Sequence, residues 1–307
     1  MNLFSLTLLM LSFIFSLSSF GENVDTTIIK KHLIKLTKTE KARNHDNLEA
    51  LNNAASYIFS EFNKYADTTF YQSYMANGKE YKNVICRFGS EHDVTTVVGA
   101  HYDVCGNQEG ADDNASGVVG LLELARLLKS EKLSKQIELV AYTLEEPPYF
   151  RTEKMGSYIH AKSLVDESRN VSGMICLEMI GYYDSAKKSQ HYPLRFLSLF
   201  YGNKGDFITV VNKFGKQKFA RKFTKRFKKS SKVEAKKFTG PKGLQGIDFS
   251  DHLNYWKFGI SALMITDTAF YRNMHYHEHG DKMETLDLEK MARVIEAVFE
   301  SLLEVGS

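Results

Sequence analysis

The sequence lacks most of the features that mark disulfide-rich or multi-domain proteins. Its 307 residues include four prolines, which leave no obvious interdomain linker, and no internal repeat. Its three cysteines cannot all pair with one another and show no CxxC spacing for zinc or redox chemistry. Cys86 and Cys176 lie in apolar, strand-like runs and are expected to be buried thiols. Cys105 is expected to be a small loop residue, and because it closely follows the run HYDV, a place near a functional site is the alternative. We therefore expect a single domain.

Long apolar runs are scarce as well, and the one that occurs lies at the N-terminus. Residues 1–21 are apolar but contain several serines, which makes the run too short for a secure membrane span. It is typical of a signal peptide cut before Glu22, which leaves residues 22–307 as the mature domain. Because no Lys or Arg precedes the run, an uncleaved N-terminal membrane anchor is the alternative. We expect an exported protein, secreted or periplasmic, with a soluble body.

Positive charge is concentrated in one segment, although the net charge of the chain is only +3. Residues 213–242 contain 13 Lys and Arg side chains and one acid, Glu234. Phe219, Phe223 and Phe227 recur every four residues there, which predicts a helix with an apolar stripe docked on the body and a solvated basic face. Contact of this segment with an anionic membrane surface or polyanion is the alternative. No nucleic-acid partner is expected.

Hydrophobic residues make up 43% of the sequence, enough for a sizeable core, and their periodicity indicates alternating strands and helices. Strands are expected at Thr68–Met75, Tyr81–Phe88, Thr95–Asp103, Gln136–Leu144, Val171–Ile180, Phe207–Val211 and Ser261–Thr268. Helices are expected over Asp46–Tyr65, Ala115–Lys129, Thr152–Asp166, Ser250–Phe258 and Asp287–Val305. This order predicts an α/β fold with a largely parallel sheet covered on both faces.

A histidine and an acid stand together where one predicted strand ends. His101 ends the run TTVVGAH, at the edge where open α/β sheets bind ligands. Asp103, two residues later, points to the same face of the strand as His101. Its carboxylate can accept a hydrogen bond from the second imidazole nitrogen, as carboxylates do behind metal-bound histidines. The pair therefore favours a metal site over a purely structural histidine.

Acidic residues gather in three further segments. Asp112 and Asp113 stand at the head of a helix, where one can cap the helix and the other can face outward. Glu145 and Glu146 end a buried strand, so that one can bind a metal while the other handles a proton. Glu178 interrupts an apolar strand, where an unpaired carboxylate would be strongly destabilising. A metal or an arginine is therefore expected beside it.

The residue types together favour metal-dependent hydrolysis. His275, His277 and His279 alternate before the last helix, and one of them can complete a ligand set. Two imidazoles with several carboxylates suit zinc, or a pair of zinc ions with positions open for water and substrate. A metal-activated water and a nearby general base would then make a hydrolase. The HExxH motif does not occur, which excludes that type of metalloprotease.

The successive motifs resemble those of one known family. HYD, GADDNASG, EE, LEMIGYY, SDHLNYWKFGISALMITDTAF and NMHYH are similar, in this order, to the motifs of the M28 zinc aminopeptidases. The resemblance extends from about Asn47 to the final helix. It implies a single α/β domain in which a mixed, mostly parallel sheet lies between two layers of helices.

The resemblance also implies a role for each matching residue. Five residues match metal ligands: His101, Asp112, Glu146, Glu178 and His277. Asp112, directly after Gly-Ala, matches the carboxylate that bridges two metals, and Glu178 stands where the family usually has aspartate. Glu145 matches the general acid/base, and Asp103 matches the acid behind the first histidine. Residues 147–154 lengthen a usually short connection and are expected to form part of the cleft wall.

These matches predict a zinc aminopeptidase that removes N-terminal residues from peptides with two zinc ions per chain. A single-zinc acyltransferase similar to glutaminyl cyclase is the first alternative, and an inactive binding protein on the same scaffold is the second. Asp251 and His252 lie in a well-matched segment and are candidates for hydrogen bonds to substrate. Capping of the following helix is the other interpretation of Asp251.

Overall fold

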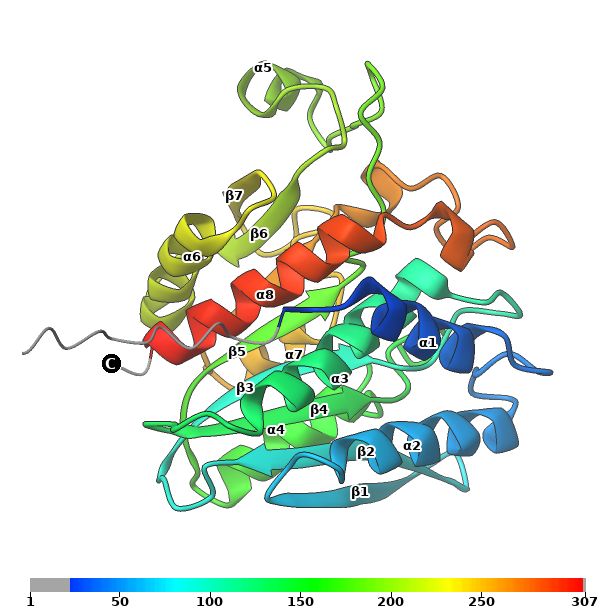
Figure 1. Ribbon diagram of the computed structural model, residues 1–307, viewed down its shortest axis with the longest axis vertical. Helices are drawn as coiled ribbons and strands as arrows, with labels where there is room; N and C mark the ends of the chain where they lie inside the picture. Colours follow the sequence, from blue (N-terminus) through cyan, green and yellow to red (C-terminus); the bar gives the residue numbers. More distant parts are fainter. Residues whose placement is uncertain (1–22, 306–307) are drawn as a thin grey trace, which may run out of the picture.

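An eight-stranded sheet runs through the computed structural model, which describes residues 23–305 (Figure 1). The strands are β1 (Thr68–Ala76), β2 (Lys79–Phe88), β3 (Val94–His101), β4 (Gln136–Tyr142), β5 (Asn170–Glu178), β6 (Ile208–Lys213), β7 (Ala235–Gly240) and β8 (Ala262–Thr266). The longer helices are α1 (Thr26–Thr37), α2 (Leu48–Phe62), α3 (Gly117–Leu128), α4 (Gly156–Asp166), α6 (Lys218–Ser230), α7 (His252–Lys257) and α8 (Leu288–Val305).

The predicted leader, residues 1–21, lies outside the described residues. Within residues 23–305, no helix combines the length and the apolar character needed to cross a membrane.

The sheet is mixed, with a parallel centre. Its strands lie in the order β1-β2-β4-β3-β5-β8-β6-β7. β3 pairs in parallel with β4 and β5, and β8 pairs in parallel with β5. Antiparallel pairs join β1 to β2, β2 to β4 and β6 to β8, while β7 is parallel to β6. The predicted fold class is therefore confirmed.

Helices cover both faces of this sheet (Figure 1). The larger core lies on the face covered by α1, α2, α3, α6 and α8, where buried Leu, Ile, Val and Phe side chains pack against the sheet. The smaller core lies on the other face and includes Leu164 of α4 and Trp256 of α7. Central strands are buried on both faces, which is why they read as nearly continuous apolar runs in the sequence.

The strands and helices predicted from periodicity are all present, but the prediction missed helix α1 and strand β7, as well as the short helical turns of the later connections. Helix α1 carries Ile29, Leu33 and Leu36 on its buried face, a helical spacing that was available in the sequence. Strand β7 lies at the edge of the sheet and is half-exposed, so its Lys-rich sequence shows no strong apolar alternation. Helix α4 begins at Gly156, four residues after the predicted start at Thr152.

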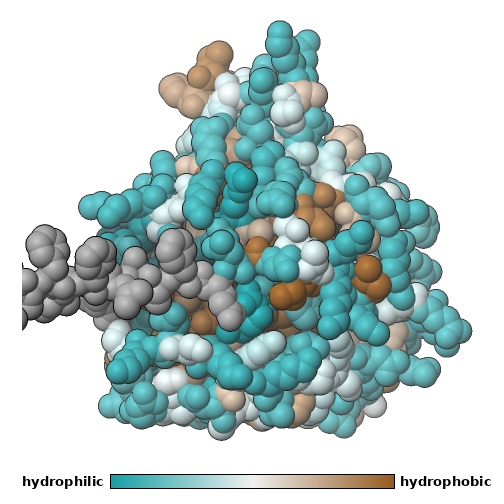
Figure 2. All heavy atoms as spheres, viewed as in Figure 1, coloured by the Kyte–Doolittle hydropathy of each residue, from teal (hydrophilic) through white to brown (hydrophobic). Residues whose placement is uncertain are grey.

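A protruding arm, residues 184–206, connects β5 to β6 at the top of the molecule in Figure 1. A bridge between Asp184 and Gly205 closes its base. Its tip carries the short helix α5 (Ser198–Tyr201), whose Leu199 and Phe200 are 83% and 77% exposed. Figure 2 shows a brown group at the top of the molecule, where Figure 1 labels α5, and further brown groups near the centre of the same face.

The basic segment folds as its Phe spacing predicts. Phe219, Phe223 and Phe227 of α6 are buried, and the rings of successive members stack with centroids 6.0 and 6.3 Å apart. The Lys and Arg side chains lie mainly on the opposite, solvent-facing side of the helix. Docking of the apolar stripe is thus confirmed, and contact with an anionic surface stays a prediction.

A buried arginine ties three parts of the fold together near the carboxyl edge of the sheet. Arg43 is 1% exposed and donates hydrogen bonds to the carbonyl oxygens of Leu36 in α1, Tyr102 after β3, and Gly110. Gly110 precedes the segment that carries Asp112 and Asp113. The guanidinium therefore fixes the loop from which these acids project.

We expect Arg43→Met to lower the free energy of unfolding by about 3 kcal/mol or more, because several buried carbonyl oxygens lose their donors. Chemical denaturation measures the change. Lys41→Met, an exposed position two residues earlier, is the control and should change stability by less than about 0.5 kcal/mol. Equal stability of the two variants would contradict this role of Arg43.

Candidate metal centre

The candidate site lies at the edge of the sheet where the central parallel strands end. His101 is the last residue of β3, and Glu178 is the last residue of β5. Glu145 and Glu146 follow β4, which lies on the other side of β3. Because parallel strands end at the same edge, three predicted segments meet there. His277 reaches the same place from the connection between β8 and α8.

Asp113 lies at the centre of this cluster, between two imidazoles. Its Oδ1 is 3.3 Å from Nε2 of His101, and its Oδ2 is 3.3 Å from Nε2 of His277. On the first side, Oε2 of Glu178 lies 3.4 Å from the His101 nitrogen. On the second side, Oε2 of Glu146 lies 3.1 Å from the His277 nitrogen. The cluster thus has a His101 half and a His277 half that share one carboxylate.

The assignment of Asp112 as the shared carboxylate is wrong. Its Oδ1 accepts a hydrogen bond from the Gly181 N–H at 3.0 Å, and its Oδ2 accepts one from Nδ2 of Asn273 at 2.9 Å. The backbone at Asp113 is extended, with φ −102° and ψ 93°, so the two neighbouring acids point to different places. Helix α3 begins only at Gly117, and neither acid caps it.

Two acids that the sequence analysis did not single out hold this segment. The carboxylate of Asp281 accepts hydrogen bonds from the N–H groups of Asp112 and Asp113 at 2.8 and 3.0 Å. Asp267, fully buried, lies beside Asp112, and burial together with this neighbour raises the pKa of Asp112 well above its usual range. In the sequence both residues resemble ordinary loop acids, and only the fold shows what they contact.

Glu178 is held on the His101 half by neutral donors. Ser250 Oγ donates to its Oε2 at 2.6 Å, and Asn114 Nδ2 lies 3.3 Å from the same oxygen. Asn114 also donates to the carbonyl oxygen of Leu177. The side chain of Glu178 therefore reaches the cluster, even though the family usually has the shorter aspartate there.

Asp103 positions the other residues, but its carboxylate is not the main partner of His101. The Nδ1–H of His101 donates to the backbone carbonyl oxygen of Asp103 at 3.1 Å, while the nearer carboxylate oxygen is 3.6 Å away. This leaves Nε2 as the nitrogen that faces Asp113 and Glu178. The Asp103 carboxylate instead accepts the N–H groups of Glu145 and Glu146 at 3.2 and 3.1 Å.

Glu145 stands beside the His101 half of the cluster. It is 7% exposed, and its Oε2 lies 3.9 Å from Nε2 of His101. Burial raises the pKa of its carboxyl well above the usual range, although His101 opposes the shift. Glu145 lines a cavity together with Pro147 and Phe150, so the predicted cleft wall is confirmed for these two residues.

The electrostatics of the cluster fit a divalent cation. Burial raises the pKa of Glu146 to about 7, and burial raises the pKa of Glu178 as well. Against the effect of burial, Asp113 and Glu146 raise the pKa of His277 to about 11. Oε1 of Glu146 is buried without a hydrogen-bond partner among the described residues. Closely spaced carboxylates with two imidazole nitrogens form a donor set suited to zinc.

The two residues predicted to face substrate are fully buried. His252 bonds through Nε2 to the carbonyl oxygen of Ile247 at 2.8 Å and packs edge-on against Trp256, so its predicted substrate contact is wrong. Asp251 occupies the N-cap position of α7, yet its side chain makes no capping hydrogen bond. Burial raises the pKa of Asp251 to about 7. Neither residue lines the cavities beside the cluster.

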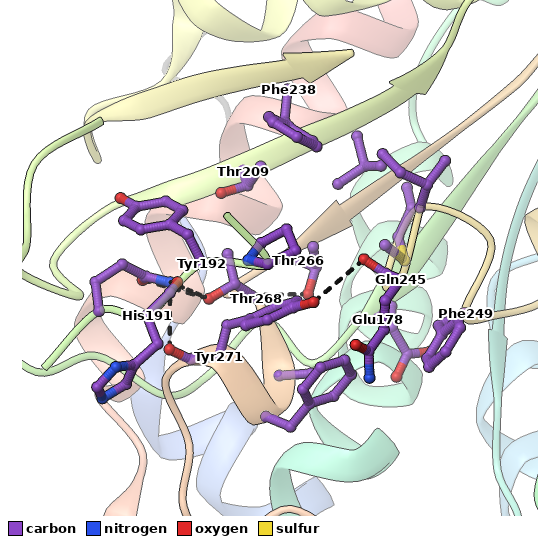
Figure 3. A pocket seen from close by; sticks show the side chains of 18 of the residues that line it. Glu178, His191, Tyr192, Thr209, Phe238, Gln245, Phe249, Thr266, Thr268 and Tyr271 are labelled. Atoms are coloured by element: carbon purple, nitrogen blue, oxygen red, sulfur yellow. Dashed lines mark hydrogen bonds between the residues drawn. The ribbon is translucent and has the colours of Figure 1, made fainter. Parts of the chain in front are cut away.

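An apolar cavity adjoins the cluster (Figure 3). Glu178 and Phe249 line both this cavity and the one that contains Glu145, so the two cavities are neighbours. Its walls include Phe207, Phe238 and Tyr271, and no Lys, Arg or Asp lines it. It measures about 690 Å³ when counted out to its open mouth.

Comparisons with known sequences assign the chain to a peptidase family. A family model described as Peptidase family M28 matches residues 83–302. The uncharacterized protein YfbL of Escherichia coli (strain K12) is 44% identical over 278 residues, which cover 88% of this chain and 85% of that protein. A probable leucine aminopeptidase of Arthroderma otae is 27% identical over 220 residues, which cover 68% of this chain and 53% of that protein.

Solved structures share the fold. The LapA aminopeptidase of Legionella pneumophila matches with a TM-score of 0.73 at 20% identity, covering 92% of this chain and 72% of that one. A glutaminyl cyclase of Bacteroides thetaiotaomicron bound to N-acetylhistamine matches with a TM-score of 0.67 at 17% identity, covering 92% of this chain and 99% of that one. The fold is therefore common to proteins of both activities.

The central position of Asp113 predicts different behaviour for the two neighbouring acids. We expect Asp113→Asn to weaken zinc binding by more than about 100-fold, beyond the loss typical of an outer-sphere partner. Asp112→Asn, the matched control, should stay within about ten-fold of the wild type, since its carboxylate contacts Gly181 and Asn273 instead. Competition titration with a zinc chelator measures both. Equal losses would contradict the assignment.

Proposed function

Because the chain belongs to peptidase family M28, we propose that it is a zinc-dependent aminopeptidase that removes N-terminal residues from peptides and holds two zinc ions. The observation that carries the proposal is the position of Asp113, 3.3 Å from each of two imidazole nitrogens that lie in separate donor sets. One ion would be held by His101 and Glu178, and the other by Glu146 and His277. Asp113 would help to hold both ions.

Zinc, when bound, would polarise the scissile carbonyl and lower the pKa of a bound water molecule. Glu145 would remove a proton from the attacking water and return it to the leaving amine. Its position supports both steps, because it is buried beside His101 and lines the cavity. Burial raises the pKa of its carboxyl, which favours the protonated form that would return the proton to the leaving amine.

We further propose that the apolar cavity receives the side chain of the N-terminal residue. It opens beside Glu178, and aromatic rings make up much of its wall, which favours large apolar side chains over charged ones. Figure 3 shows Glu178 on one side of the cavity and His191 and Tyr192 toward the other. Asp103 would keep Glu145 in place through the backbone.

We also propose that the protein works outside the cytoplasm, on the strength of the apolar run in residues 1–21. Peptides would then be its substrates in the periplasm or the medium.

The cyclase and the inactive binding protein are distinguished from the peptidase by metal content and by Glu145. A complete donor set on both halves favours two ions over the single ion of a cyclase-like enzyme. A binding protein has no use for a second buried acid beside Glu146, which costs free energy unless it performs a task. Zinc analysis of the protein beginning near Glu22 tests the first point, since one ion per chain would favour the cyclase.

Glu145→Gln is expected to lower kcat for peptide hydrolysis by about 10²–10⁴-fold, because the proton acceptor is lost. Zinc content should remain at the wild-type value. Glu153→Gln, an exposed acid in the same connection, is the control and should retain full activity. Steady-state kinetics with a zinc assay on each variant measure this, and full turnover by Glu145→Gln would refute the mechanism.

A panel of aminoacyl chromogenic substrates tests the cavity. We expect kcat/KM for Leu, Phe and Tyr derivatives to exceed that for Asp and Lys derivatives by at least about ten-fold, because the cavity wall is mainly apolar and its one acid, Glu178, is assigned to a zinc ion. Phe249→Ala should reduce this preference, whereas Phe214→Ala, an exposed ring outside the cavity, should leave it intact. A preference for charged side chains would contradict the proposal.

A further inference from the structure

We propose that Cys105 supplies a sulfur ligand to the zinc ion of the His277 half. The inference rests on the proposed zinc centre and adds a residue that the assigned donor sets do not include. The two zinc ions would then have different ligands. The ion of the His101 half would be bound by nitrogen and oxygen alone, and the ion of the His277 half also by a thiolate.

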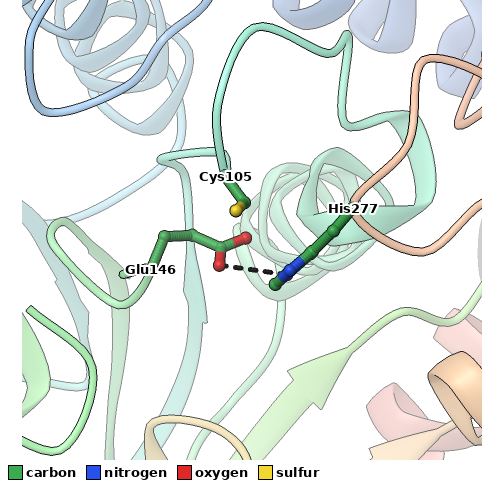
Figure 4. Close-up of side chains that lie close together, drawn as sticks. All are labelled: Cys105, Glu146 and His277. Atoms are coloured by element: carbon green, nitrogen blue, oxygen red, sulfur yellow. Dashed lines mark ion pairs between the residues drawn. The ribbon is translucent and has the colours of Figure 1, made fainter. Parts of the chain in front are cut away.

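The thiol lies against the donors of that half. Cys105 follows the end of β3 by four residues, in a loop where its side chain is half-buried. Its Sγ, a carboxylate oxygen of Glu146 and a ring nitrogen of His277 all lie within 4.8 Å of one another. Figure 4 shows the sulfur directed toward the Glu146 carboxylate, with the His277 ring on the far side of that group.

A second observation points to a ligand in the same place. Glu146 is 3% exposed, and one of its oxygens, Oε2, is the atom that approaches His277. The other oxygen, Oε1, is buried and has no hydrogen-bond partner among the described residues. Figure 4 shows this second oxygen on the side of Cys105. A buried carboxylate oxygen without a partner is costly, and a cation between it and the sulfur would remove that cost.

The distances are compatible with coordination after a small adjustment. Zinc bonds of about 2.0–2.3 Å in a tetrahedral site place neighbouring donors about 3.3–3.8 Å apart. Donors within 4.8 Å of one another therefore need to close by roughly 1 Å. Rotation of Cys105 about its first side-chain torsion can supply this, because the side chain lies in a loop and is not packed in the core.

Binding of zinc by Cys105 would release a proton. The thiol loses its proton to solvent as the sulfur–zinc bond forms, so one proton is released for each Cys105 that binds. No oxidant or reductant takes part. Asp113, Glu146, His277 and Cys105 together then provide four donors, the number typical of a closed tetrahedral site.

A closed His277 half has a functional consequence. Catalytic zinc sites usually have three protein ligands and leave the fourth position for water or substrate. A thiolate in that position competes with both, so the resting protein would be latent at this ion until Cys105 moves away. The other two cysteines cannot do this: Cys86 is buried in the core on β2, and Cys176 contacts Ser250.

Cobalt substitution tests the inference through a signal that does not depend on activity. Metal-free protein is loaded with Co²⁺, and the near-ultraviolet spectrum is recorded for a sulfur-to-cobalt charge-transfer band. We expect the band in the wild type and in the control Cys86→Ala, and its loss in Cys105→Ser with two cobalt ions still bound. Cys105→Ser should also weaken zinc binding at one site by about ten-fold or more, at least the loss caused by removing an outer-sphere partner.

Two outcomes would overturn the inference, and they are distinguishable. If the wild type binds two cobalt ions without the band, or if the band persists in Cys105→Ser, Cys105 is not a ligand and the proposed aminopeptidase stands. If the wild type binds no cobalt or zinc, the proposed function fails together with the sulfur ligand. Circular dichroism of each variant shows that any lost signal reflects the missing ligand and not unfolding.

Discussion

The carboxylate of Asp113, held between two imidazoles, is the interaction on which the rest of the site depends. Its two oxygens lie 3.3 Å from His101 and His277, which come from segments far apart in the sequence. Asp281 fixes its backbone, and Arg43 fixes the residue before its loop. Several buried polar groups thus hold one side chain in place, as expected for a side chain that joins the two halves of the proposed metal centre.

The charge balance of the site explains why the same residues favour metal binding. Glu145, Glu146 and Glu178 are buried close to Asp113, and ionised carboxylates in such a place are unstable without compensating positive charge. Protonated imidazoles can supply some of it, because Asp113 and Glu146 raise the pKa of His277 to about 11. Two divalent ions would supply it fully and return the histidines to the neutral form that binds metal.

Much of the architecture could be predicted because burial leaves a clear pattern. The central strands are apolar along their whole length, and α8 buries one face, so periodicity located them. The residue types of the centre were also predictable, since His101 and Glu178 end strands that run in parallel. Edge strand β7 was missed, because a half-exposed strand rich in Lys carries little apolar signal.

The sequence by itself determined the fold class, the residue types of the candidate metal centre and the edge of the sheet where they gather. Only the tertiary structure decided between Asp112 and Asp113, because an extended backbone at Asp113 turns adjacent acids in different directions. It also showed His252 to be buried against Trp256, and it brought Cys105 beside Glu146. Such choices depend on side-chain direction and on contacts between distant segments, and neither is encoded in local spacing.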